Sequence, residues 1–158
     1  MTVLSSSNLA MIAATVPVPS YDRERLRTGI VHIGVGGFHR AHEAMYIDSL
    51  MERGTGHDWG ITGVGLLPGD RRMADVMAKQ DCLYTLVLKH PDGSREPRVI
   101  GSLVDYLFAP EQPEDVLRVM AEPSTRIVSL TITEGGYHVN QATGEFDAEA
   151  PAIRHDLA

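Results

Sequence analysis

The sequence predicts an α/β fold built on an open, mostly parallel sheet that includes one antiparallel hairpin. Short apolar runs rich in β-branched residues alternate with helical runs along the chain, as in a doubly wound sheet. The first apolar run ends directly in a glycine-rich turn, and a helical run follows it. A Pro-Asp-Gly sequence between two extended runs indicates a hairpin.

The first half of the chain contains two strands, each followed by a helix. Gly29–Val35 is apolar and β-branched, which is typical of a buried strand, and Phe38–Arg53 has apolar residues along one helical face. Trp59–Leu66 predicts the second strand. Pro68 suits the first turn of the next helix, Pro68–Lys79.

The second half begins with the hairpin, in which Cys82–Leu88 pairs with Arg98–Leu107. An antiparallel pair in this position predicts that the sheet is mixed. Gln112–Ala121 opens with proline and acidic residues, which favour a helix start. Arg126–Thr131 predicts a third buried strand, and Ala148–Leu157 a last helix.

Length and composition limit the domain count and the class of protein. The 158 residues suffice for one domain. We expect residues 1–20 to form an N-terminal surface segment and residues 21–158 the domain. The formal net charge of −7 argues against a nucleic-acid partner. The apolar run Leu9–Val18 is too short to span a bilayer and lacks the preceding basic residues of a signal peptide.

The single cysteine, Cys82, rules out an internal disulfide and a cysteine-based zinc site. It fits a reducing, cytoplasmic location, and we expect a buried, inert thiol.

The glycine-rich turn carries the main functional prediction. Gly34 and Gly36 match the first two positions of G-x-G-x-x-G, Gly37 follows, and His39 takes the third position. The first glycine permits the tight turn, and the second lets a pyrophosphate approach the backbone. The sequence therefore predicts a Rossmann-like dinucleotide site, with a purely structural turn as the alternative.

An acidic residue after the second strand usually binds the adenosine ribose, and Asp70 is the candidate, although it lies beyond the usual spacing. It also suits the first turn of a helix. Arg71 and Arg72 follow it and suit either adenine or phosphate contacts, or plain solvent exposure. Glu134 lies beside two glycines after the third strand, where it either lines the site or stabilises its own turn.

Histidines raise a metal hypothesis, which the sequence does not favour. His39 and His42 share a helical face, but no third ligand is evident, so we expect no metal site. His32 lies in an apolar strand and is expected to be a hydrogen-bonded core residue. A small histidine-dependent hydrolase stays an alternative. The chain lacks a G-x-S-x-G elbow and a Walker-type G-K-[ST] motif.

Three motifs in order resemble the polyol-specific long-chain dehydrogenase/reductase family. They are Gly-Val-Gly-Gly-Phe-His-Arg-Ala-His at 34–42, Asp-Trp-Gly-Ile leading to Gly-Val-Gly-Leu at 58–66, and Arg-Ile-Val-Ser-Leu-Thr-Ile-Thr-Glu-Gly-Gly-Tyr at 126–137. The resemblance covers about residue 21 to the end. It implies NAD(P)-dependent oxidation of a mannitol-like sugar alcohol to a ketose, without a metal. A sugar-acid reductase of the fructuronate type is the alternative within the family.

The resemblance also implies which residues hold the cofactor. NAD is favoured, with NADP open because Gly69 stands where members often carry a second acidic residue. The implied positions are Gly34, Gly36, Gly37, Phe38, His39 and Arg40 around the pyrophosphate, Asp70 at the ribose, and Thr133 and Glu134 by the nicotinamide.

Family members are much longer than this chain and carry the catalytic lysine in a helical second domain. The resemblance therefore implies an incomplete N-terminal cofactor domain with no catalytic residue of its own, inactive without the rest of the enzyme. A stand-alone nucleotide-binding or regulatory module is the competing interpretation.

Overall fold

Four parallel strands form the central sheet of the computed structural model, which describes residues 3–140 and 142–158. They are β1 (Thr28–Ile33), β2 (Gly60–Gly65), β5 (Leu103–Phe108) and β6 (Ile127–Leu130). Their order is β5-β2-β1-β6, and every pair is parallel. The predicted open, mostly parallel α/β sheet is confirmed, and its order is that of a dinucleotide-binding half followed by a strand on the far side of β1.

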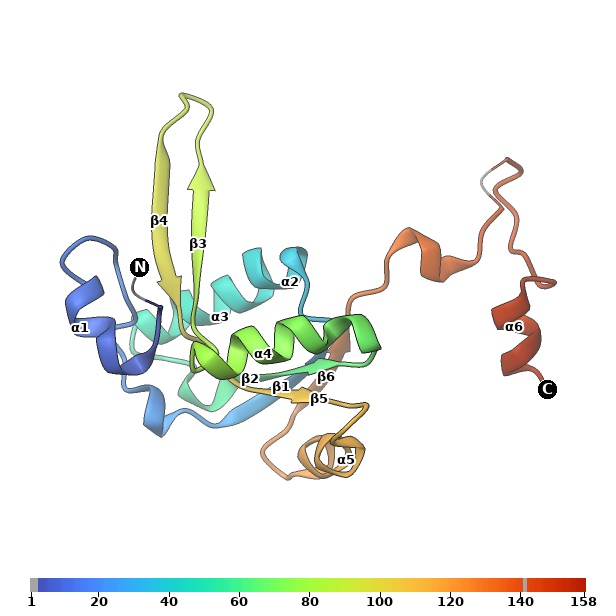
Figure 1. The fold of residues 1–158 in the computed structure, drawn as a ribbon, viewed down its shortest axis with the longest axis horizontal. Coiled ribbons are helices and arrows are strands. Elements are labelled where there is room, and N and C mark those ends of the chain that lie inside the picture. Colours follow the sequence, from blue (N-terminus) through green and yellow to red (C-terminus); the bar gives the residue numbers. More distant parts are fainter. Residues whose placement is uncertain (1–2, 141) are drawn as a thin grey trace.

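The hairpin does not join this sheet, so the prediction of one mixed sheet is wrong. β3 (Tyr84–Lys89) and β4 (Arg95–Ile100) form a separate antiparallel pair that projects from the domain (Figure 1). The chain bends at Gly101 and Ser102, and the residues after the bend form β5. Two hydrogen bonds to residues 43–52 hold this bend in place. The Gly101 N–H donates to Asp48 (2.8 Å), and Ser102 Oγ donates to the Ala44 carbonyl (2.6 Å).

Helices cover both faces of the parallel sheet (Figure 1). α3 (Glu43–Glu52) and α4 (Arg71–Lys79) lie on one face, and α5 (Pro113–Ala121) lies on the other. Side chains alternate accordingly along β1: Ile30 packs with the α3 and α4 cluster, and Val31 packs against Val116 of α5.

The helix predicted after β1 is divided into two. α2 (Gly37–Ala41) ends at His42, whose φ of −122° and ψ of −86° leave the helical region, and α3 begins with the next residue. The Phe38 carbonyl accepts hydrogen bonds from the His42 backbone N–H (3.1 Å) and from His42 Nδ1 (2.8 Å). The short helix α2 is therefore a separately oriented unit at the end of β1.

β6 is an exposed edge strand, although its sequence predicts a buried one. Ile127, Val128 and Leu130 are 45%, 49% and 57% exposed. Among the described strands, only β1 pairs with it. The chain after β6 extends away from the sheet and carries η5 (Glu134–Tyr137) and α6 (Pro151–Asp156) (Figure 1).

The N-terminal segment lies against the base of the hairpin. It contains η1 (Ser6–Asn8) and α1 (Leu9–Ile12). The Val99 N–H of β4 donates to the Pro17 carbonyl (2.8 Å), and the Ser6 N–H donates to Asp81 (2.8 Å). η2 (Arg23–Arg25) precedes β1, η3 (His57–Trp59) precedes β2, and η4 (Pro68–Asp70) precedes α4. None of the described helices combines the length and the apolarity needed to cross a bilayer.

Candidate functional site

The glycine-rich turn lies at the carboxyl end of β1. Gly34 has φ +91°, a left-handed conformation that side chains rarely adopt. Its N–H donates to the Val64 carbonyl of β2 (2.9 Å), and the Gly36 N–H donates back to the Gly34 carbonyl (2.7 Å). These two bonds close a tight turn, from which α2 starts at Gly37.

Open space lies in front of this turn. A Cβ added to Gly37 would meet no atom within 4 Å, and one added to Gly36 would meet only the Gly34 carbonyl oxygen at 3.9 Å. The N–H groups of Gly37, Phe38 and His39 belong to the first helical turn, and none of the described hydrogen bonds uses them. The turn therefore offers both room and free donors to an anion such as a pyrophosphate.

A cavity of about 430 Å³ lies on the α4 side of the turn. Asp70 is in its wall and sits at the end of β2, where an added Cβ on Gly65 would collide with Asp70 and with the Tyr106 hydroxyl. The Asp70 carboxylate accepts the Leu67 N–H (3.0 Å) and so stabilises its own turn. We name this hollow the α4-side cavity; it is lined by Arg40, Gly69, Asp70, Arg72, Met73 and Val76.

The arginines near this cavity have different roles. Arg40 donates from Nε to the Gly36 carbonyl (3.2 Å), so its side chain lies along the turn. Arg71 pairs with Glu111 and lies 4.9 Å from the centre of the Phe108 ring, which holds it on the α5 side. Arg72 is the one of the two consecutive arginines that lines the α4-side cavity.

A second cavity, of about 390 Å³, lies on the other side of the turn, between α2 and the end of β6. This is where the strand order reverses, because β2 and β5 lie on one side of β1 and β6 on the other. Ligands of open α/β sheets bind at this switch point. We name this hollow the β6-side cavity; it is lined by His32, Phe38, His39, Glu43, Ser129, Leu130, Thr131, Ile132 and Tyr137.

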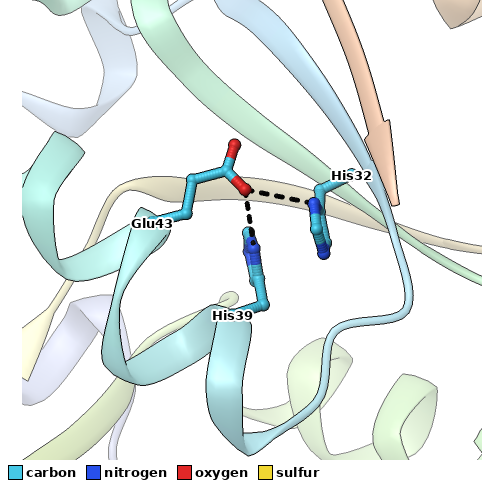
Figure 2. A group of neighbouring side chains, drawn as sticks. All are labelled: His32, His39 and Glu43. Carbon is cyan, nitrogen blue, oxygen red and sulfur yellow. Dashed lines mark hydrogen bonds and ion pairs between the residues drawn. The ribbon is translucent and has the colours of Figure 1, made fainter. Parts of the chain in front are cut away.

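Two histidines and a glutamate form the floor of the β6-side cavity (Figure 2). One oxygen of Glu43 faces Nδ1 of His32 at 3.2 Å and Nδ1 of His39 at 3.3 Å. The two imidazoles are stacked, with ring centres 3.7 Å apart. Ser129 lies within hydrogen-bonding distance of His32 Nδ1 (2.8 Å) and of the other Glu43 oxygen (3.5 Å). The cluster thus joins β1, α2, α3 and β6.

Protonation in this cluster follows from its contacts. A carboxylate only accepts hydrogen bonds, so each Nδ1 that faces Glu43 carries a proton. These donors hold the pKa of Glu43 well below its usual range. Burial lowers the pKa of His39 despite the nearby carboxylate, and its buried Nε2 has no partner among the described atoms. His39 is therefore neutral near pH 7, with Nε2 as the unprotonated nitrogen.

The cluster is poorly arranged for a metal ion, although its three ligating atoms lie within 4.8 Å of one another. A metal lies about 2 Å from each ligating imidazole nitrogen and close to the plane of its ring. Rings inclined by only 13° and stacked at 3.7 Å share no such point. His42, paired with His39 in the metal hypothesis, lies instead on the outer surface against Phe38.

The structure brings together only some of the predicted cofactor-binding residues. Arg40 and Asp70 line one cavity beside the turn, but the buried His39 side chain points away from the turn into the cluster. Thr133 is exposed and precedes η5. Glu134 begins η5, and its side chain lies outside the described part of the structure.

Sequence reasoning missed Glu43, Ser129 and Thr131. The Thr131 hydroxyl lies 3.1 Å from His32 Nε2, which confirms the expectation of a hydrogen-bonded core histidine. Glu43 lies four residues after His39, a spacing that allows contact along a helix. Ser129 of β6 and Thr131, just after that strand, are two residues apart, a spacing that places both on one face of an extended chain. Those two spacings are the only signals that the sequence contains for this cluster.

Two larger surface hollows, of about 900 and 690 Å³, are lined around η2 by Asp22 and Glu24. Neither is lined by residues of the glycine-rich turn, so we place the site at the carboxyl ends of the strands on topological grounds rather than by size.

Comparison with known proteins identifies relatives of this chain. The model of the mannitol dehydrogenase Rossmann domain matches residues 28–156. Mannitol 2-dehydrogenases of Pyricularia oryzae and Aspergillus fumigatus are 50% and 53% identical over 98% of this chain, and the matches cover 31% and 32% of their lengths. The structure of Pseudomonas fluorescens mannitol 2-dehydrogenase in a ternary complex with NAD and D-mannitol superposes with a TM-score of 0.85 and 49% identity, covering 98% of this chain and 31% of that one. The chain thus spans about a third of the length of these relatives.

Proposed function

The chain belongs to the mannitol dehydrogenase family, and from that premise we propose that it binds NAD as the cofactor-binding part of a polyol dehydrogenase. The observation that carries the proposal is the turn at Gly34–Gly37, which combines a left-handed glycine, open space and unused N–H groups. Relatives named mannitol 2-dehydrogenase, one of them solved with NAD and D-mannitol, support the same assignment.

The residues around the turn fit a dinucleotide that crosses it. The N–H groups of Gly37, Phe38 and His39 would hold the pyrophosphate, with Arg40 alongside. Asp70 would accept hydrogen bonds from the adenosine ribose in the α4-side cavity. The nicotinamide half would face the β6-side cavity, close to Thr133 and Glu134.

The bound cofactor supplies a hydride acceptor for the oxidation of a sugar alcohol such as mannitol to a ketose. The chain's own contribution is to bind and orient that cofactor. No described residue beside the turn fits the proton-accepting lysine that the family resemblance implies. Lys79 and Lys89 are exposed and line neither cavity beside the turn. We propose that the described residues alone catalyse no polyol oxidation.

A titration with NADH tests this proposal. We expect saturable binding of NADH to the folded chain, seen as enhanced cofactor fluorescence, and no turnover when mannitol and NAD are added. A folded sample that shows no saturable binding would contradict the proposal. Turnover of mannitol would contradict the absence of a proton acceptor.

A fructuronate-type reductase would use the same cofactor site, so NADH binding does not distinguish it. The polyol-dehydrogenase assignment is preferred because the relatives reported above are mannitol 2-dehydrogenases.

A nucleotide-binding module without chemistry would show the same NADH titration. Adding the segment that the relatives carry beyond the matched third would distinguish such a module from a dehydrogenase. Gain of mannitol oxidation supports the dehydrogenase, and NADH binding without it supports the module.

A further inference from the structure

The β6-side cavity contains one feature that cofactor binding alone does not require, a carboxylate held by two stacked imidazoles. Glu43 is 33% exposed at the side chain, whereas the side chains of His32 and His39 are 4% and 0% exposed. All three side chains line the cavity, and that of Glu43 is the most exposed of them; Figure 2 shows how they face one another.

The other described walls of this cavity carry no formal charge. Beyond the cluster they consist of Phe38, Ser129, Leu130, Thr131, Ile132 and Tyr137. Arg40 lines the α4-side cavity instead and is turned toward the Gly36 carbonyl and the Tyr84 ring. With neutral imidazoles, the cavity floor thus has a net charge of −1, located on Glu43.

The two redox forms of a nicotinamide differ in charge. The oxidised ring is a cation and the reduced ring is neutral, while the pyrophosphate and both riboses are the same in the two forms. An anion near the ring stabilises the oxidised form by a Coulomb energy that the reduced form lacks. Any effect on the shared part of the cofactor cancels when the two affinities are compared.

We propose that Glu43 is a specificity-determining residue that favours oxidised over reduced nicotinamide in the β6-side cavity. The proposal rests on the proposed function, since it requires a dinucleotide at the glycine-rich turn. The two Nδ1–H donors and the Ser129 hydroxyl hold the carboxylate in place, and they keep it ionised by lowering its pKa.

The test is a pair of calorimetric titrations, with NAD⁺ and with NADH, of the wild-type chain and of Glu43→Gln at pH 8.5. The amide keeps the shape and removes the charge. We expect the ratio Kd(NAD⁺)/Kd(NADH) to rise about fivefold, as for a charge acting through a partly wet cavity. Glu52→Gln is the matched control, because Glu52 is on the same helix α3 but binds Ser20 away from the cavity. It should leave the ratio unchanged.

A structural role for Glu43 predicts a different result, in which both affinities weaken equally and the ratio stays constant. That outcome would overturn the proposal. Failure of the wild-type chain to bind either form would overturn the proposed function together with this inference.

A second variant keeps the test valid if Glu43→Gln does not fold. Tyr137 lines the same cavity and is 56% exposed, so Tyr137→Lys should not disturb the core. Its ammonium opposes the charge of Glu43, and the ratio should rise as it does for Glu43→Gln. An unchanged ratio would contradict a nicotinamide in this cavity.

Discussion

At the scale of single residues, the glycines of the turn serve two different needs. The backbone requires glycine at position 34, because a residue with a side chain is strained at its φ of +91°. Gly37 meets no protein atom that would exclude a Cβ, and it lies in a helical turn. The fold therefore demands glycine at position 34 and makes no such demand at position 37.

Substitution by alanine separates these needs. We expect Gly34→Ala to lower the free energy of unfolding by about 1–2 kcal/mol, from the left-handed conformation. Gly37→Ala should keep or slightly raise stability, since alanine favours a helix, and should weaken NADH binding at least tenfold by blocking the approach to the backbone. Chemical denaturation and NADH titration measure the two effects. Unchanged NADH affinity in Gly37→Ala would count against the anion site.

The histidine–glutamate cluster predicts a loss of stability in acid. Burial lowers the pKa of His39 from its ordinary 6.5, so the unfolded chain binds a proton on this ring more readily than the folded chain does. The neutral ring therefore contributes stability above pH 6.5. That stability is lost as the pH falls through the lowered pKa of the folded state. Glu43, with its pKa lowered from 4.5, adds a loss of the same sign below pH 4.5.

Between pH 7 and pH 5, His39→Gln should flatten the fall in unfolding free energy, because the amide does not titrate. His155→Gln is the control, since that side chain is 88% exposed, and it should leave the slope unchanged. Urea denaturation across this range measures both. An equally steep fall in His39→Gln would show that other groups cause the acid sensitivity.

At the scale of elements, one buried carboxylate fixes how the hairpin leaves the sheet. Asp48 of α3 is 0% exposed and accepts hydrogen bonds from Tyr21 Oη (2.6 Å), from the Gly101 N–H (2.8 Å) and from Arg98, with which it also forms an ion pair. Burial and the nearby Asp48 raise the pKa of Tyr21, so the phenol stays a donor. The network joins α3 to the end of β4 and to the segment before β1.

Removal of this acceptor takes a partner from the buried Gly101 N–H and from the half-buried Tyr21 hydroxyl and Arg98 guanidinium. We expect Asp48→Ala to lower the unfolding free energy by about 3 kcal/mol or more. The exposed pair between Arg71 and Glu111 gives the comparison, and Glu111→Ala should cost about 1 kcal/mol or less. Similar losses in the two variants would show that the Asp48 network does not fix the bend.

Most elements follow from local sequence, and the errors have tertiary causes. The strand periods and the glycine-rich turn predict β1, β2 and the start of α2 closely. The bend at Gly101 depends on Asp48, which is far away in the sequence, so a continuous extended run was the natural local prediction. The exposure of β6 depends on whether another segment pairs with its outer edge. The apolar sequence of the strand does not indicate whether such a segment is present.

At the scale of the whole molecule, the outer edge of β6 is an exposed apolar strand of the kind that promotes association. We expect the chain to associate as its concentration rises, and Val128→Lys to reduce this, since a charge on an edge strand opposes pairing. Sedimentation velocity measures both. Leu117→Lys, on the exposed face of α5, is the control and should not change the association.

The candidate site was predictable to the extent that it is contiguous in the sequence. One motif predicts the turn from Gly34 to Arg40, and the position after the second strand predicts Asp70. The floor of the β6-side cavity was not, because Glu43 and Ser129 reach His32 only when α3 and β6 pack against β1. Side-chain contacts between separate elements leave little trace in a single sequence.

The central claim is that the free backbone N–H groups of the glycine-rich turn bind a dinucleotide. Amide chemical shifts of the ¹⁵N-labelled chain during a titration with NADH test it most directly. We expect the signals of Gly37, Phe38 and His39 to move earliest and furthest, with one common Kd. Saturation of the chain with NADH while those three signals stay in place would contradict it.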